Sequence, residues 1–80
     1  MLQNGYQLYA ARALAGLSQV QLAKFSGLSA TAIVALERKR EASLSGSSVN
    51  TLTRIEKVLT EHGVRLVETD EGTGAIRVHA

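Results

Sequence analysis

The side chains that could do chemistry in this chain of 80 residues are cations and hydrogen-bond donors rather than nucleophiles or metal ligands. The chain has no cysteine, and its two histidines, His62 and His79, lie too far apart in sequence to suggest a local metal site. No nucleophile with an adjacent base, no carboxylate pair with helical metal spacing and no phosphate-cradling loop is found in it. The sequence therefore predicts no enzyme activity and no metal or other cofactor.

The densest positive charge is the run Arg38-Lys39-Arg40. The net charge is only +2, but residues 1–48 carry five Lys and Arg against two Glu, so the positive excess lies in this part of the chain. A basic run usually marks only a solvated helix end, where cations interact favourably with the helix dipole. Beside a nucleic acid, the same run would neutralise phosphates and release counterions.

The elements that would hold these side chains can be predicted from capping residues and from apolar spacing. Asn4 with Gln7, and Ser18 with Gln21, have the spacing of a capping box, while Ser29 and Ser48 can act as simple N-caps. The predicted helices are 5–15, 19–25, 30–38 and 49–61, and they are ended by Gly16, by Gly27 at a position suited to a left-handed C-cap and, for the last helix, by Gly63.

Two segments lie outside these helices. The small polar residues of 41–48 predict a flexible loop. In the tail the side chains alternate as in strands around a Gly-rich turn, which predicts a hairpin of 64–68 and 75–79. An isolated hairpin is marginal in water, so it is expected to lie on the helices or to pair with a partner's strands.

The second and third predicted helices have the spacing of a helix-turn-helix. A small residue, Ala23, falls where the two helices would cross, Gly27 falls at the turn, and Ile33 and Leu36 point inward. The alternative is an ordinary helical hairpin, because Ala and Gly are common near turns.

Residues 7–40 resemble the XRE family, the phage-repressor and Cro-type helix-turn-helix regulators. The family hallmark GLSQ..LA...G.S...I...E is matched by the segment 16–37, and the tail is similar to a subgroup of short bacterial members that end in a strand pair. The resemblance implies a mainly α fold, a four- or five-helix lambda-repressor-like helix-turn-helix domain with a C-terminal β-hairpin. The expected organisation is a single domain over 1–80, in which 1–62 form the DNA-binding bundle and 63–80 a strand pair that is a candidate dimerisation element.

The resemblance also implies roles for individual residues. Gln19, at the start of the second helix, is expected to touch the phosphate backbone or a base, and Arg12 is expected to pair with Glu37. The run Arg38, Lys39 and Arg40 would lie along the phosphates. The residues expected to face the major groove of double-stranded DNA are Ser29, Ala30, Thr31, Val34 and Ala35.

The expected recognition face departs from the family pattern, because it offers no Gln, Asn, Arg or Lys before Arg38. Such side chains discriminate bases by about 1–3 kcal/mol per bidentate pair. Thr31 is the one hydrogen-bonding side chain there, and Ala30, Val34 and Ala35 could pack on thymine methyl groups. Two functions therefore stay open. The first is a homodimeric transcriptional regulator, most simply a repressor, on a pseudo-palindromic operator. The second is an antiactivator or antitoxin-like protein that uses the same face to bind a regulatory protein partner.

The composition predicts where the protein works. No apolar run approaches the roughly 20 residues that a membrane span needs, and the start MLQNGYQ lacks the basic and apolar regions of a signal peptide. With no cysteine to form disulfides, the sequence predicts a soluble protein of the reducing cytoplasm.

Overall fold

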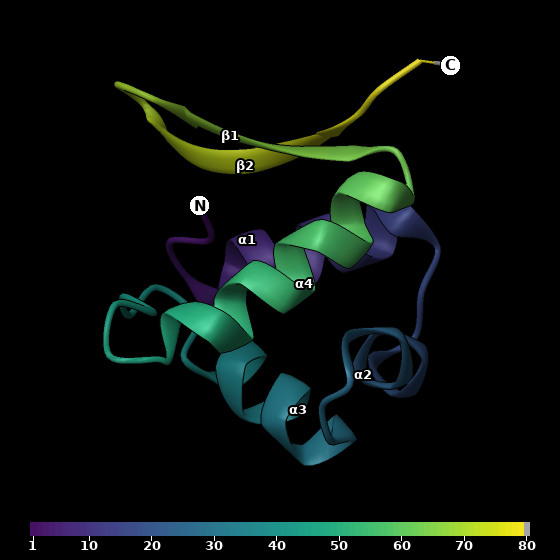
Figure 1. The fold of residues 1–80 in the computed structure, drawn as a ribbon. Coiled ribbons are helices and arrows are strands. Elements are labelled where there is room, and N and C mark those ends of the chain that lie inside the picture. Colours follow the sequence, from purple (N-terminus) through teal and green to yellow (C-terminus); the bar gives the residue numbers. More distant parts are fainter. Residues whose placement is uncertain (80) are drawn as a thin grey trace.

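The computed structural model describes residues 1–79 and contains four helices followed by two antiparallel strands. The helices pack together and the strand pair lies across one end of them, above α1 and α4 (Figure 1). The expected fold class is confirmed, with four helices rather than five. The elements are α1 (Gly5–Ala15), α2 (Gln19–Ser26), α3 (Ala30–Arg38), α4 (Val49–Glu61), β1 (Val64–Thr69) and β2 (Gly72–Arg77).

Each helix begins at the predicted cap. The side-chain oxygens of Asn4, Ser18, Ser29 and Ser48 each accept a hydrogen bond from the backbone N–H three residues later, which satisfies one of the free donors of the first turn. Gly16 and Gly27 follow α1 and α2 with φ of 74° and 70°, a left-handed conformation that costs glycine little.

The core runs through all four helices and into the first strand, where Val64 is buried. Residues 41–48 lie between α3 and α4 as the predicted loop, but the loop is anchored to the core, because Leu44 is completely buried. The backbone N–H of Leu44 also donates to the carbonyl of Gln3 at 2.9 Å. The largest fully buried side chains are Leu8, Leu22, Ile33, Leu44, Ile55 and Leu59.

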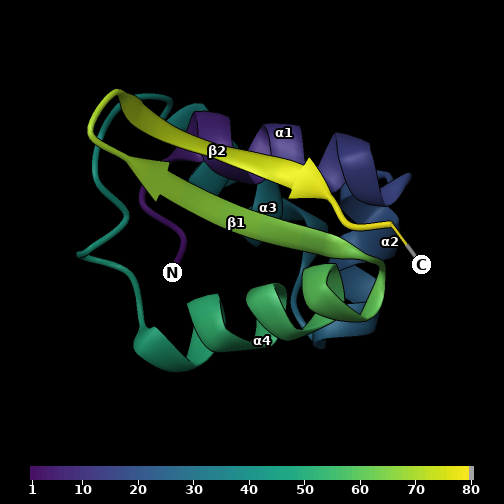
Figure 2. The same cartoon turned by 90° about the horizontal axis from the view of Figure 1, so that it is seen from above.

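The hairpin is shifted from its predicted position. The second strand is Gly72–Arg77 rather than 75–79, because only Asp70 and Glu71 connect the strands and the glycines belong to the ladder. The hydroxyl of Thr69 accepts from the N–H of Glu71 at 3.2 Å and so tightens this short turn. Seen from above, β2 lies over α1 while β1 lies between α1 and α4 (Figure 2).

Gln7 joins α1 to this hairpin. Its expected capping box with Asn4 forms only in part, because the Gln7 side-chain oxygen accepts from the N–H of Gln3 at 2.7 Å instead. Its amide nitrogen donates to the carbonyls of Val67 and Gly74, at 3.3 and 3.0 Å, in opposite strands. Gln7 is only 2% exposed, so all three bonds replace water.

Gly5 lets α1 approach the end of α3 with backbone against backbone. Its N–H donates to the carbonyl of Arg40 at 2.8 Å. A Cβ built on Gly5 would lie 2.5 Å from the carbonyl oxygen of Glu37, 2.6 Å from that of Leu36 and 2.7 Å from the nitrogen of Arg40. These neighbours are backbone atoms, which cannot turn aside as a side chain can.

Replacing Gly5 by alanine is therefore expected to lower the free energy of unfolding by about 3 kcal/mol, the upper part of the usual overpacking range. Helix propensity alone predicts the opposite sign, because alanine favours a helix over glycine. Urea unfolding followed by circular dichroism measures the difference. Gly46→Ala is the matched control, since nothing lies within 4 Å of a Cβ at that loop position. Equal midpoints for the two variants would contradict the close approach.

Candidate nucleic-acid interface

The segment from α2 to α3 has the geometry of a helix-turn-helix. Ser18 and Gln21 form a complete capping box at the start of α2. After Gly27 the N–H of Leu28 donates back to the carbonyl of Ala23 at 2.9 Å, which closes the turn. Ala23 is 3% exposed and Ile33 is fully buried, so the small residue and the inward face of α3 lie where the spacing predicts.

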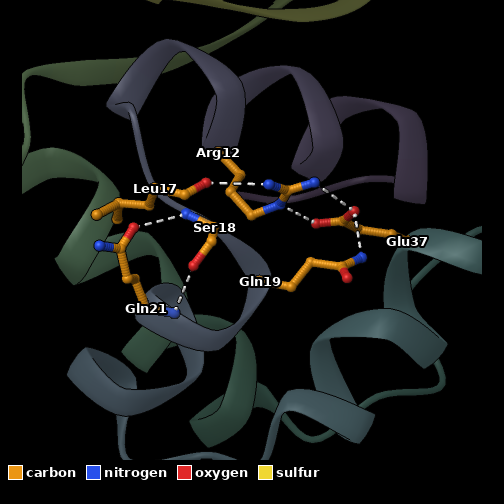
Figure 3. Close-up of polar contacts among 6 residues, drawn as sticks. All are labelled: Arg12, Leu17, Ser18, Gln19, Gln21 and Glu37. Atoms are coloured by element: carbon orange, nitrogen blue, oxygen red, sulfur yellow. Dashed lines mark hydrogen bonds and ion pairs between the residues drawn. The ribbon is translucent and has the colours of Figure 1, made fainter.

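Arg12 and Glu37 form a two-pronged ion pair beside this motif (Figure 3). The guanidinium of Arg12 donates from Nε to Glu37 Oε2 at 2.6 Å and from Nη2 to Oε1 at 3.1 Å. A third nitrogen, Nη1, donates to the carbonyl of Leu17 at 3.0 Å, and Gln19 Nε2 donates to Glu37 Oε1 at 3.1 Å. The carboxylate therefore receives donors from α1 and α2 while it belongs to α3.

The pair is largely removed from water, with the side chain of Arg12 14% exposed and that of Glu37 7%. The hydrogen bonds that Arg12 donates to Glu37 raise the pKa of Arg12, against the opposing effect of burial. A raised pKa keeps the guanidinium charged, so its contribution to stability is lost only on the alkaline side of the ordinary arginine pKa. Near neutral pH the guanidinium of Arg12 therefore stays positively charged.

The expected contact residues of α3 differ in exposure. Thr31 and Ala35 are exposed, whereas Ala30 and Val34 are half-buried. Ser29 is exposed and its hydroxyl accepts from the N–H of Ala32 at 3.1 Å, so it caps the helix. Ala30 packs against the core, so Thr31, Val34 and Ala35 remain as the candidate outward contacts of α3, and two of these three side chains are apolar.

The basic run begins at Arg38, the last residue of α3, and continues into the loop that follows. Arg38, Lys39 and Arg40 are exposed, and within residues 1–79 none of them makes a salt bridge. Arg40 has φ of 52°, the one non-glycine residue with a positive φ in this range. Its carbonyl accepts from the N–H groups of Gly5 and Tyr6 at 2.8 and 3.3 Å, so α1 holds this left-handed residue in place.

Gln19 is the first residue of α2, the position expected for it. It is half-buried, and its amide nitrogen is engaged with Glu37, which fixes the side chain at the start of α2. Gln19 thus lies beside the expected backbone contacts, held in a set orientation. No three His, Cys, Asp or Glu side chains within residues 1–79 are grouped to hold a metal ion.

Two residues beside this surface were missed from the sequence. Tyr6 and Tyr9 are 52% and 58% exposed on α1, and the Arg12 guanidinium lies 5.3 Å from the centre of the Tyr9 ring. Tyr6, Tyr9 and Arg12 recur every three positions, which places them on one side of α1. That spacing is the one sequence signal that could have identified the two tyrosines. They lie opposite the apolar stripe from which the helix was predicted, so the stripe gave no reason to single them out.

These features, a capped α2, a glycine turn and an α3 whose inward face is buried, define a helix-turn-helix protein. A helix-turn-helix family model matches residues 8–59, from within α1 to within α4, which is more than half of the chain. The chain belongs to this family of DNA-binding regulators, in its XRE-type branch. No curated protein matches the chain. None of the helices described within residues 1–79 is long and apolar enough to cross a membrane.

Replacing Glu37 by glutamine is expected to lower the free energy of unfolding by about 3 kcal/mol, the lower part of the range for breaking a buried pair. The variant keeps the shape of the side chain but leaves the Arg12 charge without its counterion. Thermal and urea unfolding measure the loss, and Glu41→Gln serves as the control because Glu41 is exposed and outside the network. If the two variants unfolded at the same temperature, the pair would not support the fold.

Proposed function

We propose that this protein is a sequence-specific DNA-binding transcriptional regulator that acts by occupying a short operator, most simply as a repressor. The observation that carries the proposal is the family match over residues 8–59, together with an exposed α3 face flanked by Gln19 and by the unpaired basic run. In such proteins the second helix of the motif enters the major groove and the surrounding residues contact the backbone.

In the proposed complex, backbone contacts set the position of α3. Arg38, Lys39 and Arg40 neutralise phosphates at the end of the helix, while Gln19 and Ser29 lie at helix starts, where backbone N–H groups also favour anions. The ion pair beneath keeps these elements at a constant separation.

In this proposal the remaining residues of the α3 face contact the bases. Thr31 can hydrogen-bond to a base edge, and Ala30, Val34 and Ala35 can pack on thymine methyl groups. Because this face offers no bidentate side chain, part of the specificity is proposed to come from the shape and deformability of the operator. Single base changes should then cost less than in a reader that uses Gln or Arg.

A second candidate function rests on the same apolar face. Ala30, Val34 and Ala35 present small side chains of the kind that pack against another helix, so α3 is also suited to an antiactivator or antitoxin-like protein that binds a regulatory protein. The two functions differ in salt dependence, since only the first requires phosphate contacts.

Binding to duplex DNA over a salt series, from about 50 to 200 mM, tests the proposal. The affinity is expected to fall steeply with salt, and Arg38→Gln or Lys39→Gln should each lower the logarithmic slope by about one unit. Lys57→Gln, which removes an exposed charge on α4, should leave the slope close to that of the natural chain. No duplex binding at low salt, with a protein partner that is lost on Val34→Asp, would favour the second candidate.

We also propose that the chain binds its operator as a homodimer, with two copies of α3 in successive major grooves. Operator symmetry in this class of regulators supports the dimer, because half-sites one helical turn apart match a protein two-fold axis. The strand pair is the proposed contact surface. Its inner face lies on α1 and α4, and none of the elements described within residues 1–79 covers the opposite face, on which Ile76 is 39% exposed (Figure 1).

Light scattering at tens of micromolar is expected to give twice the chain mass of 8.5 kDa. Ile76→Glu should shift the protein toward the monomer, because it places a charge on the proposed contact surface. Val49→Glu is the comparison on α4, where Val49 is 66% exposed. A dimer lost only on Val49→Glu would move the interface to α4, and a monomeric natural chain would refute the dimer.

A further inference from the structure

A concave pocket of about 460 Å³ lies between α1 and the end of α3. One wall is formed by Tyr6 and Tyr9 of α1, and the other by Val34, Arg38 and Arg40. Val34 and Arg38 also belong to the expected DNA-contacting surface, so the pocket opens beside the face that α3 presents to a major groove.

The charges around this pocket favour an anion. Glu37 lies at its base, but the carboxylate is already engaged by Arg12 and Gln19. Arg38 and Arg40 have no salt-bridge partner within the part of the chain that the structure describes. The pocket therefore holds two guanidinium groups against one carboxylate that is itself neutralised by Arg12. Guanidinium groups are well suited to phosphate, which they can bind through two parallel hydrogen bonds.

The tyrosines add donors and apolar surface to the same pocket. More than half of each tyrosine is exposed, and no side-chain hydrogen bond described within residues 1–79 engages either hydroxyl. The Arg12 guanidinium lies over the Tyr9 ring, 5.3 Å from its centre, within the range of a cation–π interaction. A tyrosine in this position presents an apolar ring together with a hydroxyl that can donate to an anion.

We propose that this pocket binds one phosphodiester group of the DNA backbone, on the strand that borders the groove occupied by α3. Arg38 and Arg40 neutralise the phosphate, while Tyr6 and Tyr9 donate their hydroxyls to its oxygens and pack their rings on the adjoining deoxyribose. α1 thereby becomes a DNA-contacting element beside the helix-turn-helix. This assignment rests on the proposed DNA-binding function and adds two contact residues to it.

The test uses the full chain and a short duplex of random sequence, because a backbone contact does not depend on base sequence. The double variant Tyr6→Phe/Tyr9→Phe is expected to weaken binding about tenfold through loss of hydrogen bonds to a charged group. Its salt slope should stay unchanged, because no charge is removed, whereas Arg40→Gln should lower the slope by about one unit. Phe25→Leu is the control, since Phe25 is 58% exposed on α2 and lines a different pocket.

A direct readout is available because the chain contains two tyrosines and no tryptophan. Incorporation of 3-fluorotyrosine gives two ¹⁹F resonances, and both are expected to shift when the duplex is added. Duplex binding by the natural chain with unmoved resonances, or with equal affinity in the double phenylalanine variant, would overturn the pocket assignment alone. If the natural chain bound no duplex at any salt concentration, the DNA-binding function would fail first and the pocket assignment with it.

Discussion

The carboxylate of Glu37 is the point at which three helices meet. It belongs to α3, it accepts two hydrogen bonds from Arg12 of α1, and it accepts a third from Gln19 at the start of α2. The Glu37 side chain is 7% exposed, so water cannot easily replace a missing donor. Loss of any of these hydrogen bonds would therefore destabilise the fold. Their shared acceptor sets the angle between the first turn of α2 and the last turn of α3, the two places from which a helix-turn-helix contacts the DNA backbone. Besides this ion pair, the close backbone approach at Gly5 also holds α1 against the end of α3.

The hairpin has a comparable attachment on the opposite side of α1. A two-stranded sheet is marginal in water, and here it is stabilised by burial of Val64 and by the amide of Gln7, which donates to a carbonyl in each strand. Peripheral bonds join the same elements, since Arg77 donates to the carbonyl of Leu14, and Asn4 donates to Thr73. α1 therefore carries Tyr6 and Tyr9, two residues of the proposed DNA interface, on one side and the strand pair on the other. A change in hairpin packing would reach this proposed interface through a single helix.

The features that could be predicted from the sequence are those whose causes lie within a few residues. The N-caps and the glycine stops act over one turn, so the helix bounds were predicted to within a residue, and the motif spacing placed Ala23 and Ile33 correctly. The errors concern partners far away in the chain. Leu44 is the one large apolar residue in the loop of residues 41–48, and only the folded core explains its burial. The second strand begins at Gly72 because the ladder and Gln7, more than 60 residues away, outweigh the tendency of glycines to mark a turn. The aromatic residues of α1 lie opposite its apolar stripe, where periodicity gives no information about function.

The bonds of Gln7 have a consequence for how the protein is made. During synthesis the helices emerge from the ribosome before β1 and β2, so the amide of Gln7 and the groove that receives Val64 must wait for them. Until β2 has been translated, the nascent chain lacks the Gly74 carbonyl that accepts from Gln7 and the Ala75 side chain that packs against the core. α1 consequently reaches its final environment only after β2, which follows it by more than 50 residues in the chain, has packed against it.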